Sequence, residues 1–368
     1  MKLTLQLRLL PDAEQTKRLL ATMERANEAA TFAARLGFAA QVFSQPSIHK
    51  LAYAEIRSRF GLSAQVAVRA IGKAVECFAR DKSKCPVFKP HGAITYDERI
   101  FGFKGIDKVS MWGLPEGRII VPLVYGEYQK DRFDRIKGQA DLVYRKGKFY
   151  LYCTVNLPDT APVDPTDFLG VDLGIANIAT TSDGVRVSGS TVKSVRCRQR
   201  RLRTKLQKLQ TRAAKRRLKK LAGKEKRFAR HTNHVISKGI VACAKGTTRG
   251  VKLEDLSGIR ERITAGRKQR VVLHSWAFAQ LRSFIAYKAA LAGVSLVLIN
   301  PRNTSLECAA CGHIDKRNRP NQSTFCCVAC HHADHADINA ARVISGRPAS
   351  KPGEGDSARL SEIGRAHV

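Results

Sequence analysis

Two pairs of closely spaced cysteines constrain the fold of this chain more than any other feature. Each pair has the spacing CxxC, and fifteen residues separate Cys308 and Cys311 from Cys327 and Cys330. Two such turns can place four thiolates around one tetrahedral Zn²⁺, which replaces a core too small to form alone. Because four thiolates leave no open position, we expect one structural zinc ion. Cys326 adjoins Cys327, but only Cys327 completes a CxxC spacing with Cys330.

The charge of the chain indicates a polyanionic partner. Lys and Arg number 65 against 31 Asp and Glu, so the formal net charge is +34 over 368 residues. Such an excess repels itself unless a polyanion neutralises it, which makes nucleic acid the first candidate and a membrane surface the rival. No apolar run reaches the roughly 18 residues of a membrane span, and the first residues lack a signal-peptide pattern. We therefore expect a cytoplasmic protein without membrane contact, associated with the nucleoid when it binds DNA.

The first 160 residues predict a small β-barrel with a helical insertion. Residues 3–11 alternate apolar and polar side chains up to Pro11, which predicts a first strand. Helices are expected from an N-cap at Asp12 to about Gly37, and over residues 47–61 and 63–81. Short β segments follow to residue 158, with a hairpin turn in YRKGKFY. The first strand is expected to join these segments in the barrel.

A second domain is expected to begin at Phe168, after a linker rich in Pro and Asp. Residues 195–230 hold 17 Lys and Arg and one acidic residue, Glu225. Leucines at helical spacing predict a helix with a narrow apolar seam in basic faces. A helix stabilised by surface ion pairs would alternate signs, so phosphate contact is favoured over a merely solvated helix pair. Candidate contacts are Arg200, Arg201, Arg216 and Arg217 here, and Arg57, Arg69 and Lys73 on the N-terminal helices, where surface charge is an equal explanation.

Three acidic residues lie where they could hold divalent metal. Asp172 lies in the strand FLGVDLGIANIAT, Glu254 ends the strand GVKLED, and Asp337 begins the helix ADINAARVI. Taken singly they could be a turn residue, a surface charge and a helix N-cap. Phosphodiester cleavage is commonly served by two divalent ions that hard oxygen ligands hold, and a basic domain would bring the nucleic acid to them. Together, the three acids favour a nuclease metal site.

Four segments of the sequence resemble the TnpB family, the transposon-encoded proteins regarded as ancestors of type V CRISPR effectors. They are GVDLGIANIATTSDG, VKLEDLSGI, RHTNHVISKGIV and the stretch from TSLECAACGH to ADINAARVI. The resemblance runs from the first strand to about Ile344. Three acidic motifs and an inserted zinc ribbon occur in the family's order.

The resemblance implies an α+β multidomain fold. Its parts would be a wedge β-barrel (1–11 and 82–160), a helical recognition insertion (12–81), a RuvC-like, RNase H-type nuclease domain (167–303 and 333–345) and an inserted zinc ribbon (304–332). Residues 346–368 are expected to form a disordered tail, and its last residues, EIGRAHV, look like a translated sequencing adapter.

The resemblance also implies an activity, RNA-guided cleavage of DNA by a transposon-encoded endonuclease. Asp172, Glu254 and Asp337 would be the catalytic residues and would hold two Mg²⁺ ions, or Mn²⁺. The guide RNA would derive from the transposon end, and the target would be double-stranded DNA beside a short flanking motif. A companion transposase from the same element is a further expected partner, in the cytoplasm of a prokaryote.

Some alternatives stay open at this point. The chain could be a nuclease-inactive, RNA-guided repressor, a DNA transposase that acts without guide RNA, or a zinc-ribbon binding protein with no enzymatic role. His331 stands where many relatives have Gly, and Asp334 is regarded as a neighbour of the site. Weaker expectations are packing or solvated roles for His231 and His234, a helix cap at Ser275 and a core position for Trp276.

Overall fold

The computed structural model describes residues 2–115, 117–158, 160–161, 163–255 and 278–349. These residues form two compact units, one within residues 2–158 and the other within residues 160–349. Each unit has its own buried apolar cluster. No helix in these described ranges is long and apolar enough to cross a membrane.

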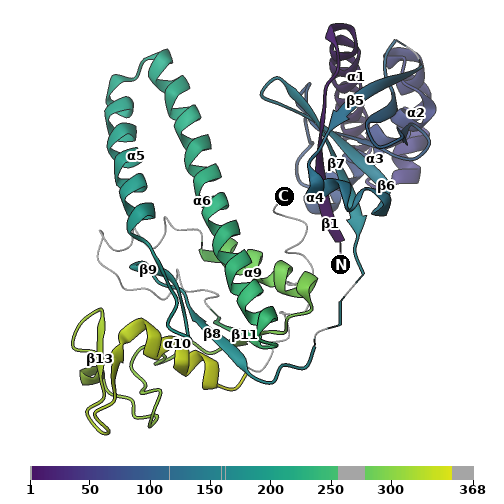
Figure 1. Cartoon of the computed structure of the whole chain (residues 1–368). Helices are drawn as coiled ribbons and strands as arrows, with labels where there is room; N and C mark the ends of the chain where they lie inside the picture. The colour runs from purple at the N-terminus through teal and green to yellow at the C-terminus, as the bar shows by residue number, and fades with distance from the viewer. Residues whose placement is uncertain (1, 116, 159, 162, 256–277, 350–368) are drawn as a thin grey trace. The chain divides into compact units, whose positions relative to one another are not determined.

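The first unit is built on a seven-stranded antiparallel sheet in the order β2-β6-β7-β1-β5-β4-β3 (Figure 1). Alternate residues of β1, including Leu5 and Leu7, are buried, as the period of two predicts. Lys146 and Gly147 both have positive φ and form the expected hairpin turn between β6 and β7. The strands are β1 Lys2–Leu9, β2 Ile94–Tyr96, β3 Phe101–Lys104, β4 Lys108–Trp112, β5 Arg118–Val124, β6 Ile136–Arg145 and β7 Lys148–Asn156.

The expected barrel is confirmed only in part. Within the described residues β2 and β3 are the two edges of the sheet, so the sheet is an open half-barrel. Closure needs hydrogen bonds between the edge strands, and the short β2 and β3 pair only with their inner neighbours, β6 and β4.

Three helices lie between β1 and β2 in the sequence, as expected: α1 Ala13–Ala39, α2 Gln45–Phe60 and α3 Ala64–Arg80. The carboxylate of Asp12 accepts a hydrogen bond from the Gln15 amide and caps α1, and Ser63 caps α3. The second helix begins earlier than expected, because Ser44 and not Ser47 is its N-cap. Two shorter elements, α4 Glu127–Lys130 and the 3₁₀ turn Phe133–Arg135, precede β6.

The second unit has a mixed five-stranded sheet in the order β10-β9-β8-β11-β12. The three strands β8, β11 and β12 run parallel, while β9 and β10 are antiparallel to their neighbours. The strands are β8 Phe168–Asp172, β9 Asn177–Thr181, β10 Arg186–Ser188, β11 Gly250–Glu254 and β12 Leu296–Ile299.

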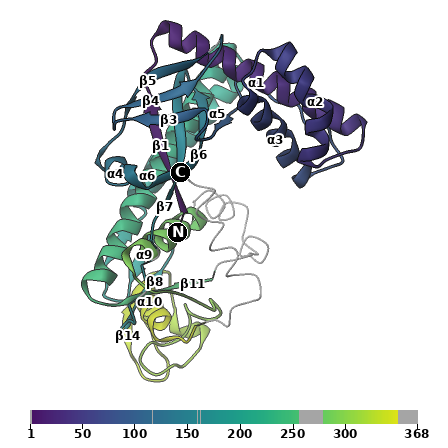
Figure 2. The same ribbon diagram turned by 90° about the vertical axis from the view of Figure 1, so that its right-hand side faces the viewer.

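Helices cover both faces of this second sheet. Leu169 and Val171 of β8 belong to the apolar cluster formed with α6, Arg212–Gly246, and α9, Phe278–Ala292. On the opposite face α10, Ala336–Gly346, crosses β8 at Gly170 (Figure 2). A Cβ at Gly170 would lie 2.0 Å from the carbonyl oxygen of Ala341, so only glycine permits this approach.

The basic helical region is two helices rather than one. Helix α5, Ser190–Leu209, ends before Gln210, whose φ of 47° is left-handed, and Thr211 caps α6 through its hydroxyl. Leu206 and Leu221 are buried, but Leu209 is 61% exposed, so the apolar seam stops at the break. Figure 1 shows α5 and α6 as a long antiparallel pair.

Between β12 and α10 the chain forms a small ribbon. It contains the 3₁₀ turn Lys316–Asn318 and a hairpin of β13, Thr324–Cys326, and β14, Ala333–His335. Phe325 is fully buried with Cys308, Cys327 and Ala336 in a separate minimal core. The residues expected to form a disordered tail lie outside the described residues from position 350 onward, and α10 continues to Gly346.

Candidate metal centres

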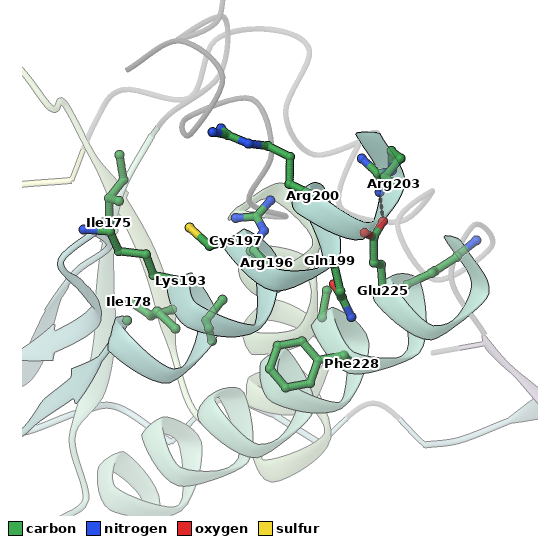
Figure 3. Close-up of a pocket in the computed structure, with 15 residues that line it drawn as sticks. Ile175, Ile178, Lys193, Arg196, Cys197, Gln199, Arg200, Arg203, Glu225 and Phe228 are labelled. Atoms are coloured by element: carbon green, nitrogen blue, oxygen red, sulfur yellow. Dashed lines mark hydrogen bonds and ion pairs between the residues drawn. The ribbon is translucent and has the colours of Figure 1, made fainter. Parts of the chain in front are cut away.

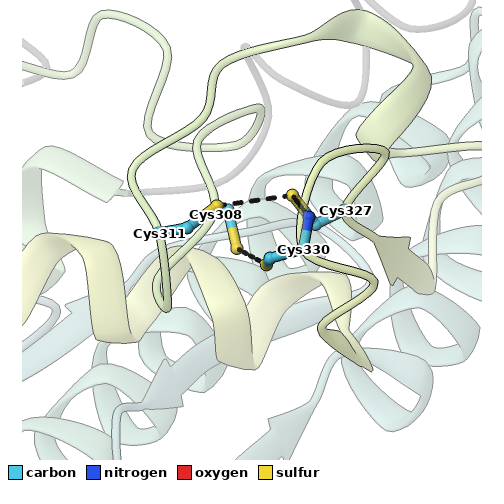
Figure 4. A group of neighbouring side chains, drawn as sticks. All are labelled: Cys308, Cys311, Cys327 and Cys330. Carbon is cyan, nitrogen blue, oxygen red and sulfur yellow. Dashed lines mark hydrogen bonds between the residues drawn. The ribbon is translucent and has the colours of Figure 1, made fainter.

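The four cysteines of the two CxxC pairs come together at the base of the ribbon (Figure 4). Their Sγ atoms all lie within 4.8 Å of one another, and the pairs Cys308–Cys330 and Cys311–Cys327 are each 3.6 Å apart. Tetrahedral Zn–S bonds of about 2.3 Å require sulfur atoms about 3.8 Å apart, close to this spacing. The donor set and its geometry therefore fit a structural zinc ion, and Cys326 is not part of the group.

The two cysteine turns have matching backbones. The amide of Gly312 donates to the carbonyl of Cys308, and the amide of His331 donates to the carbonyl of Cys327. Gly312 has φ of 74° and His331 has φ of 57°, so both positions are left-handed. His331 thus adopts a conformation that favours glycine, so glycine would suit this position better than the histidine by which the chain departs from the resemblance.

A buried asparagine joins these turns. The Asn318 side chain donates to the carbonyls of Leu306 and His313 beside the first turn and accepts from the amide of Val328 in the second. Asn339 of α10 donates to the carbonyl of Glu307 and accepts from the amide of Ala309. Both asparagines are fully buried, so the ribbon is fixed to itself and to α10 by satisfied polar groups.

The three acidic residues lie around one end of the second sheet. Asp172 is the last residue of β8 and Glu254 the last of β11, and these neighbouring strands are parallel, with Val171 beside Leu253. Asp337 lies in the first turn of α10, where His335 and not Asp337 is the N-cap. The carboxyl ends of adjacent parallel strands are the usual ligand-binding edge of an open sheet.

The three residues Asp172, Glu254 and Asp337 are called the acidic centre below. Two of its carboxylates, those of Glu254 and Asp337, accept hydrogen bonds from neighbouring side chains. Asn177 donates to Asp337 Oδ2 at 2.8 Å, and Arg319 of the ribbon donates to Asp337 Oδ1 at 3.1 Å. The hydroxyl of Thr304 donates to Glu254 Oε1. Asp337 is only 8% exposed, so these partners offset the cost of its burial.

The electrostatics of the acidic centre disfavour three bare carboxylates. Burial, first, and the negative charges of Glu254 and Asp337, second, raise the pKa of Asp172 to about 7. Burial also raises the pKa of Glu254, against the hydrogen bond from Thr304. Carboxylates that interact in this way need a proton or a cation to stabilise them.

The acidic centre fits a divalent cation in its chemistry. Its donors are hard carboxylate oxygens, and Thr180, which is paired with Asp172 across β8 and β9, has a buried hydroxyl that finds no hydrogen-bond partner among the described residues. Paired residues of neighbouring strands point to the same face, so this hydroxyl lies on the side of Asp172. Among the described residues the four cysteines are the group that lies closely enough to hold a metal ion, whereas Asp337 is bonded to Asn177 and Arg319 and Glu254 to Thr304.

The predicted phosphate contacts differ between the two units. In the first unit Arg69 pairs with Asp97 at 2.7 Å, Lys73 donates to Asn27 and to the Ala93 carbonyl, and Arg57 donates to the Leu62 carbonyl. All of these bonds lie within the first unit itself. In the second unit Arg200, Arg201, Arg216 and Arg217 are exposed on α5 and α6. All seven stay predictions as nucleic-acid contacts.

Several other predicted residues can be placed. His231 is exposed, whereas the ring of His234 stacks on Phe284 with centroids 4.0 Å apart, as expected of a packing residue. Asp334 forms an ion pair with Arg342 at 2.6 Å. Ser275 and Trp276 lie outside the described residues.

Sequence reasoning missed the residues that hold the acids. Asn177 lies 160 residues from Asp337, Thr304 lies 50 from Glu254, and Arg319 is a ribbon residue like many other basic ones. Only Asn177 had a usable signal, because it begins the strand that follows Asp172 in the same motif.

Two family models match segments of the chain between residues 151 and 344. Residues 151–256 match the OrfB_IS605 family, described as "Probable transposase", and residues 278–344 match the Cas12f1-like TNB domain. The first match contains Asp172 and Glu254, and the second contains the four cysteines and Asp337. The resemblance to the TnpB family is thereby confirmed.

Curated relatives are similar at modest identity. The CRISPR-associated endodeoxyribonuclease Cas12f1 of Sulfoacidibacillus thermotolerans is 32% identical over 241 residues, which are 61% of this chain and 54% of that protein. The TnpB-like protein MJ0751 of Methanocaldococcus jannaschii is 28% identical over 234 residues, 58% of this chain and 81% of that protein. The chain thus spans about half the length of the Cas12f1 relative.

A solved structure shares the fold. A chain of the cryo-EM Cas12f1–sgRNA–target DNA complex superposes with a TM-score of 0.62 at 15% identity, over 90% of this chain and 82% of that chain. The fold is therefore a mixed α+β fold of the Cas12f kind, with a half-barrel sheet, a mixed sheet and a four-cysteine cluster near the C-terminal end.

Proposed function

We propose that this relative of the TnpB and Cas12f proteins is an RNA-guided DNA endonuclease whose catalytic residues are Asp172, Glu254 and Asp337. One observation carries the proposal: acids from the ends of two adjacent parallel strands and from the first turn of α10 approach closely enough to raise the pKa of Asp172. The similarity to an endodeoxyribonuclease and to a chain solved with guide RNA and target DNA supports the choice of substrate.

The second unit is proposed to be the RuvC-like nuclease domain, over residues 167–303 and 333–345, with the zinc ribbon at 304–332. Two Mg²⁺ ions, or Mn²⁺, would supply an activated water and stabilise the leaving oxygen of a phosphodiester. Asp172 and Glu254 would hold them from rigid strand ends. Asp337 would complete the set from α10, which Gly170 allows to lie against β8.

The partners of the carboxylates have roles that follow from their geometry. The Thr304 hydroxyl orients Glu254, and the Asn177 amide orients Asp337. Arg319 places a fixed positive charge beside Asp337 and lowers the pKa of Asp172. Because Arg319 comes from the ribbon, the zinc site would position a group of the acidic centre, and loss of zinc should disturb both.

The first unit is proposed to be the wedge domain, residues 1–11 and 82–160, with residues 12–81 as its recognition insertion. Together they would hold a guide RNA from the transposon end and read a short motif beside the target. Base pairing would then carry the sequence specificity, while the protein reads shape and the flanking motif. The net charge of +34 is of the sign that such a complex needs.

A single experiment tests the guided activity. The chain is expressed with the non-coding DNA downstream of its gene, the bound RNA is sequenced, and a plasmid library that matches this RNA is incubated with the complex and Mg²⁺. A defined RNA with matched, flank-dependent cutting is expected. Defined RNA without cutting would favour the guided repressor, and cutting with no specific RNA would favour a transposase that acts alone.

A further inference from the structure

A cavity of about 470 Å³ lies in the second unit between α5, α6 and the turn that joins β8 to β9 (Figure 3). Ligand pockets span about 300 to 1,000 Å³, so the cavity is large enough for one nucleotide but not for a duplex. The proposed nuclease reaction does not use it.

The inner wall of the cavity is apolar. Ile178 of β9 and Val192 of α5 are buried there, and Phe228 of α6 presents its half-buried ring to the space. An aromatic face among aliphatic side chains is a stacking surface for a base, and it accepts any base because each has a π-face.

The rim of the cavity is cationic. Among the described residues that line it, five are basic and one, Glu225, is acidic and ion-paired with Arg203. Lys193 and Arg200 are exposed and Arg196 is half-buried, all on the side of α5 that borders the cavity. An apolar floor under several cations matches a nucleotide, whose base is flat and apolar and whose phosphate is anionic.

The same β8–β9 turn serves the cavity and the acidic centre. Gly174, two residues after Asp172, lines the cavity, and so does Ile178, which follows Asn177, the donor to Asp337. A Cβ at Gly174 would lie 2.8 Å from the carbonyl oxygen of Asn177, so a side chain there would push the turn open. The turn therefore fixes a wall of the cavity, Asp172 of the acidic centre and Asn177, the donor to Asp337, relative to one another.

We infer that this cavity binds one unstacked nucleotide of the DNA strand that the acidic centre cuts, with its base against Phe228 and its phosphate on the rim of Lys193, Arg196 and Arg200. The choice of the cut DNA strand, rather than guide RNA, rests on the proposed function and on the turn shared with the acidic centre. Extrusion of this nucleotide bends the strand where it passes Asp172.

Photocrosslinking tests the inference without the need for cleavage. Single-stranded DNA oligonucleotides that each carry one 5-iododeoxyuridine are irradiated with the full chain in the absence of Mg²⁺, and the crosslinked residue is found by mass spectrometry. A crosslink to Phe228 is expected, and Phe228→Leu should reduce it about fivefold or more through the lost stacking.

Charge variants keep the test valid if Phe228→Leu lowers stability, because Phe228 also packs against the core. Lys193→Gln with Arg200→Gln should reduce the crosslink yield and the affinity for the oligonucleotide. The matched control is Arg198→Gln, an exposed residue of α5 that does not line the cavity, and it should change the yield less than twofold.

The possible outcomes distinguish failure of the proposed nucleotide cavity from failure of the proposed nuclease activity. A Phe228 crosslink in a chain that never cuts guided DNA would support the cavity and overturn the proposed nuclease. Guided cutting without any Phe228 crosslink would overturn the cavity alone. A crosslink with iodouridine RNA and none with DNA would overturn the assignment to the cut strand.

Discussion

Replacing Asp172 with asparagine should stabilise the second unit when no divalent ion is bound. The pKa of Asp172 is about 7 in the folded chain against an ordinary value of 3.8. Between these values the unfolded chain loses the proton while the folded chain keeps it, so the free energy of unfolding falls as pH rises. About three pKa units at about 1.4 kcal/mol each set an upper limit of about 4 kcal/mol. Above pH 7 this decrease in the free energy of unfolding is complete and no longer changes with pH.

The variant Asp172→Asn removes this penalty. Its free energy of unfolding, measured in urea by circular dichroism in zinc-containing protein, should exceed that of the parent by about 1 to 4 kcal/mol at pH 8, and by almost nothing below pH 4. Added Mg²⁺ should stabilise the parent alone, since ligands stabilise the state that binds them. The difference between the two proteins should therefore shrink as Mg²⁺ is raised.

A second aspartate of the same unit provides the control. Asp183 accepts two hydrogen bonds from Arg249, and these bonds lower its pKa. Asp183→Asn should therefore destabilise the protein above the unfolded pKa, with the opposite sign to Asp172→Asn. If Asp172→Asn destabilised the metal-free protein at pH 8 as Asp183→Asn does, the account of a self-repelling acidic centre would be refuted.

Three further predictions concern the metals and the ribbon. The affinity for Mn²⁺, followed by electron paramagnetic resonance, should increase with pH by up to about tenfold per pH unit until pH 7 is reached, because the Asp172 proton must leave before the ion binds. Equal affinity at pH 6 and pH 8 would contradict this. Cys311→Ser should lower the zinc content, measured by mass spectrometry of the metal, while Cys326→Ser keeps one ion per chain; zinc retained in the former would exclude the four-cysteine site. His331→Gly should raise the thermal stability of the ribbon by up to about 1 kcal/mol, because φ is 57° there, and a lower melting temperature would show that the His331 side chain makes a needed contact.

Local signals in the sequence were enough for the starts of the first and third helices and for the zinc ligands. Asp12 caps the first helix as expected, and the third helix begins within one residue of its expected start because Ser63 caps it, since a cap depends on residues only three positions away. The second helix begins at Gln45, before its expected start at residue 47, because Ser44 caps it and Pro46 fits the first turn of a helix, a local signal that the prediction did not use. The cysteine spacing likewise acts within one short segment.

Features without a local sequence signal were not predictable. The break between α5 and α6 has neither Gly nor Pro and depends on Gln210 in a left-handed conformation. The half-barrel stays open because of which strands are its edges, a property of the whole sheet. Arg69 and Lys73 were candidate phosphate contacts with surface charge as an equal explanation, yet they bond to Asp97 and Asn27, which lie 28 and 46 residues away in the sequence.

The acidic centre shows the same division. Strand patterns placed Asp172 and Glu254 at strand ends, and the parallel pairing of β8 with β11 then brings the ends together. Asp337 was open to an N-cap interpretation, which is wrong because His335 holds that position. The partners Asn177, Thr304 and Arg319 come from three separate segments, so only the folded chain reveals them.

The most direct measurement of the central claim compares DNA cleavage by the guided parent with cleavage by Asp172→Ala, Glu254→Ala and Asp337→Ala, each purified with the same RNA. The account predicts that all four proteins retain RNA and zinc and that only the parent cuts matched DNA with Mg²⁺. Cleavage at the parental rate by any one of the three variants would remove that carboxylate from the catalytic site and contradict the account.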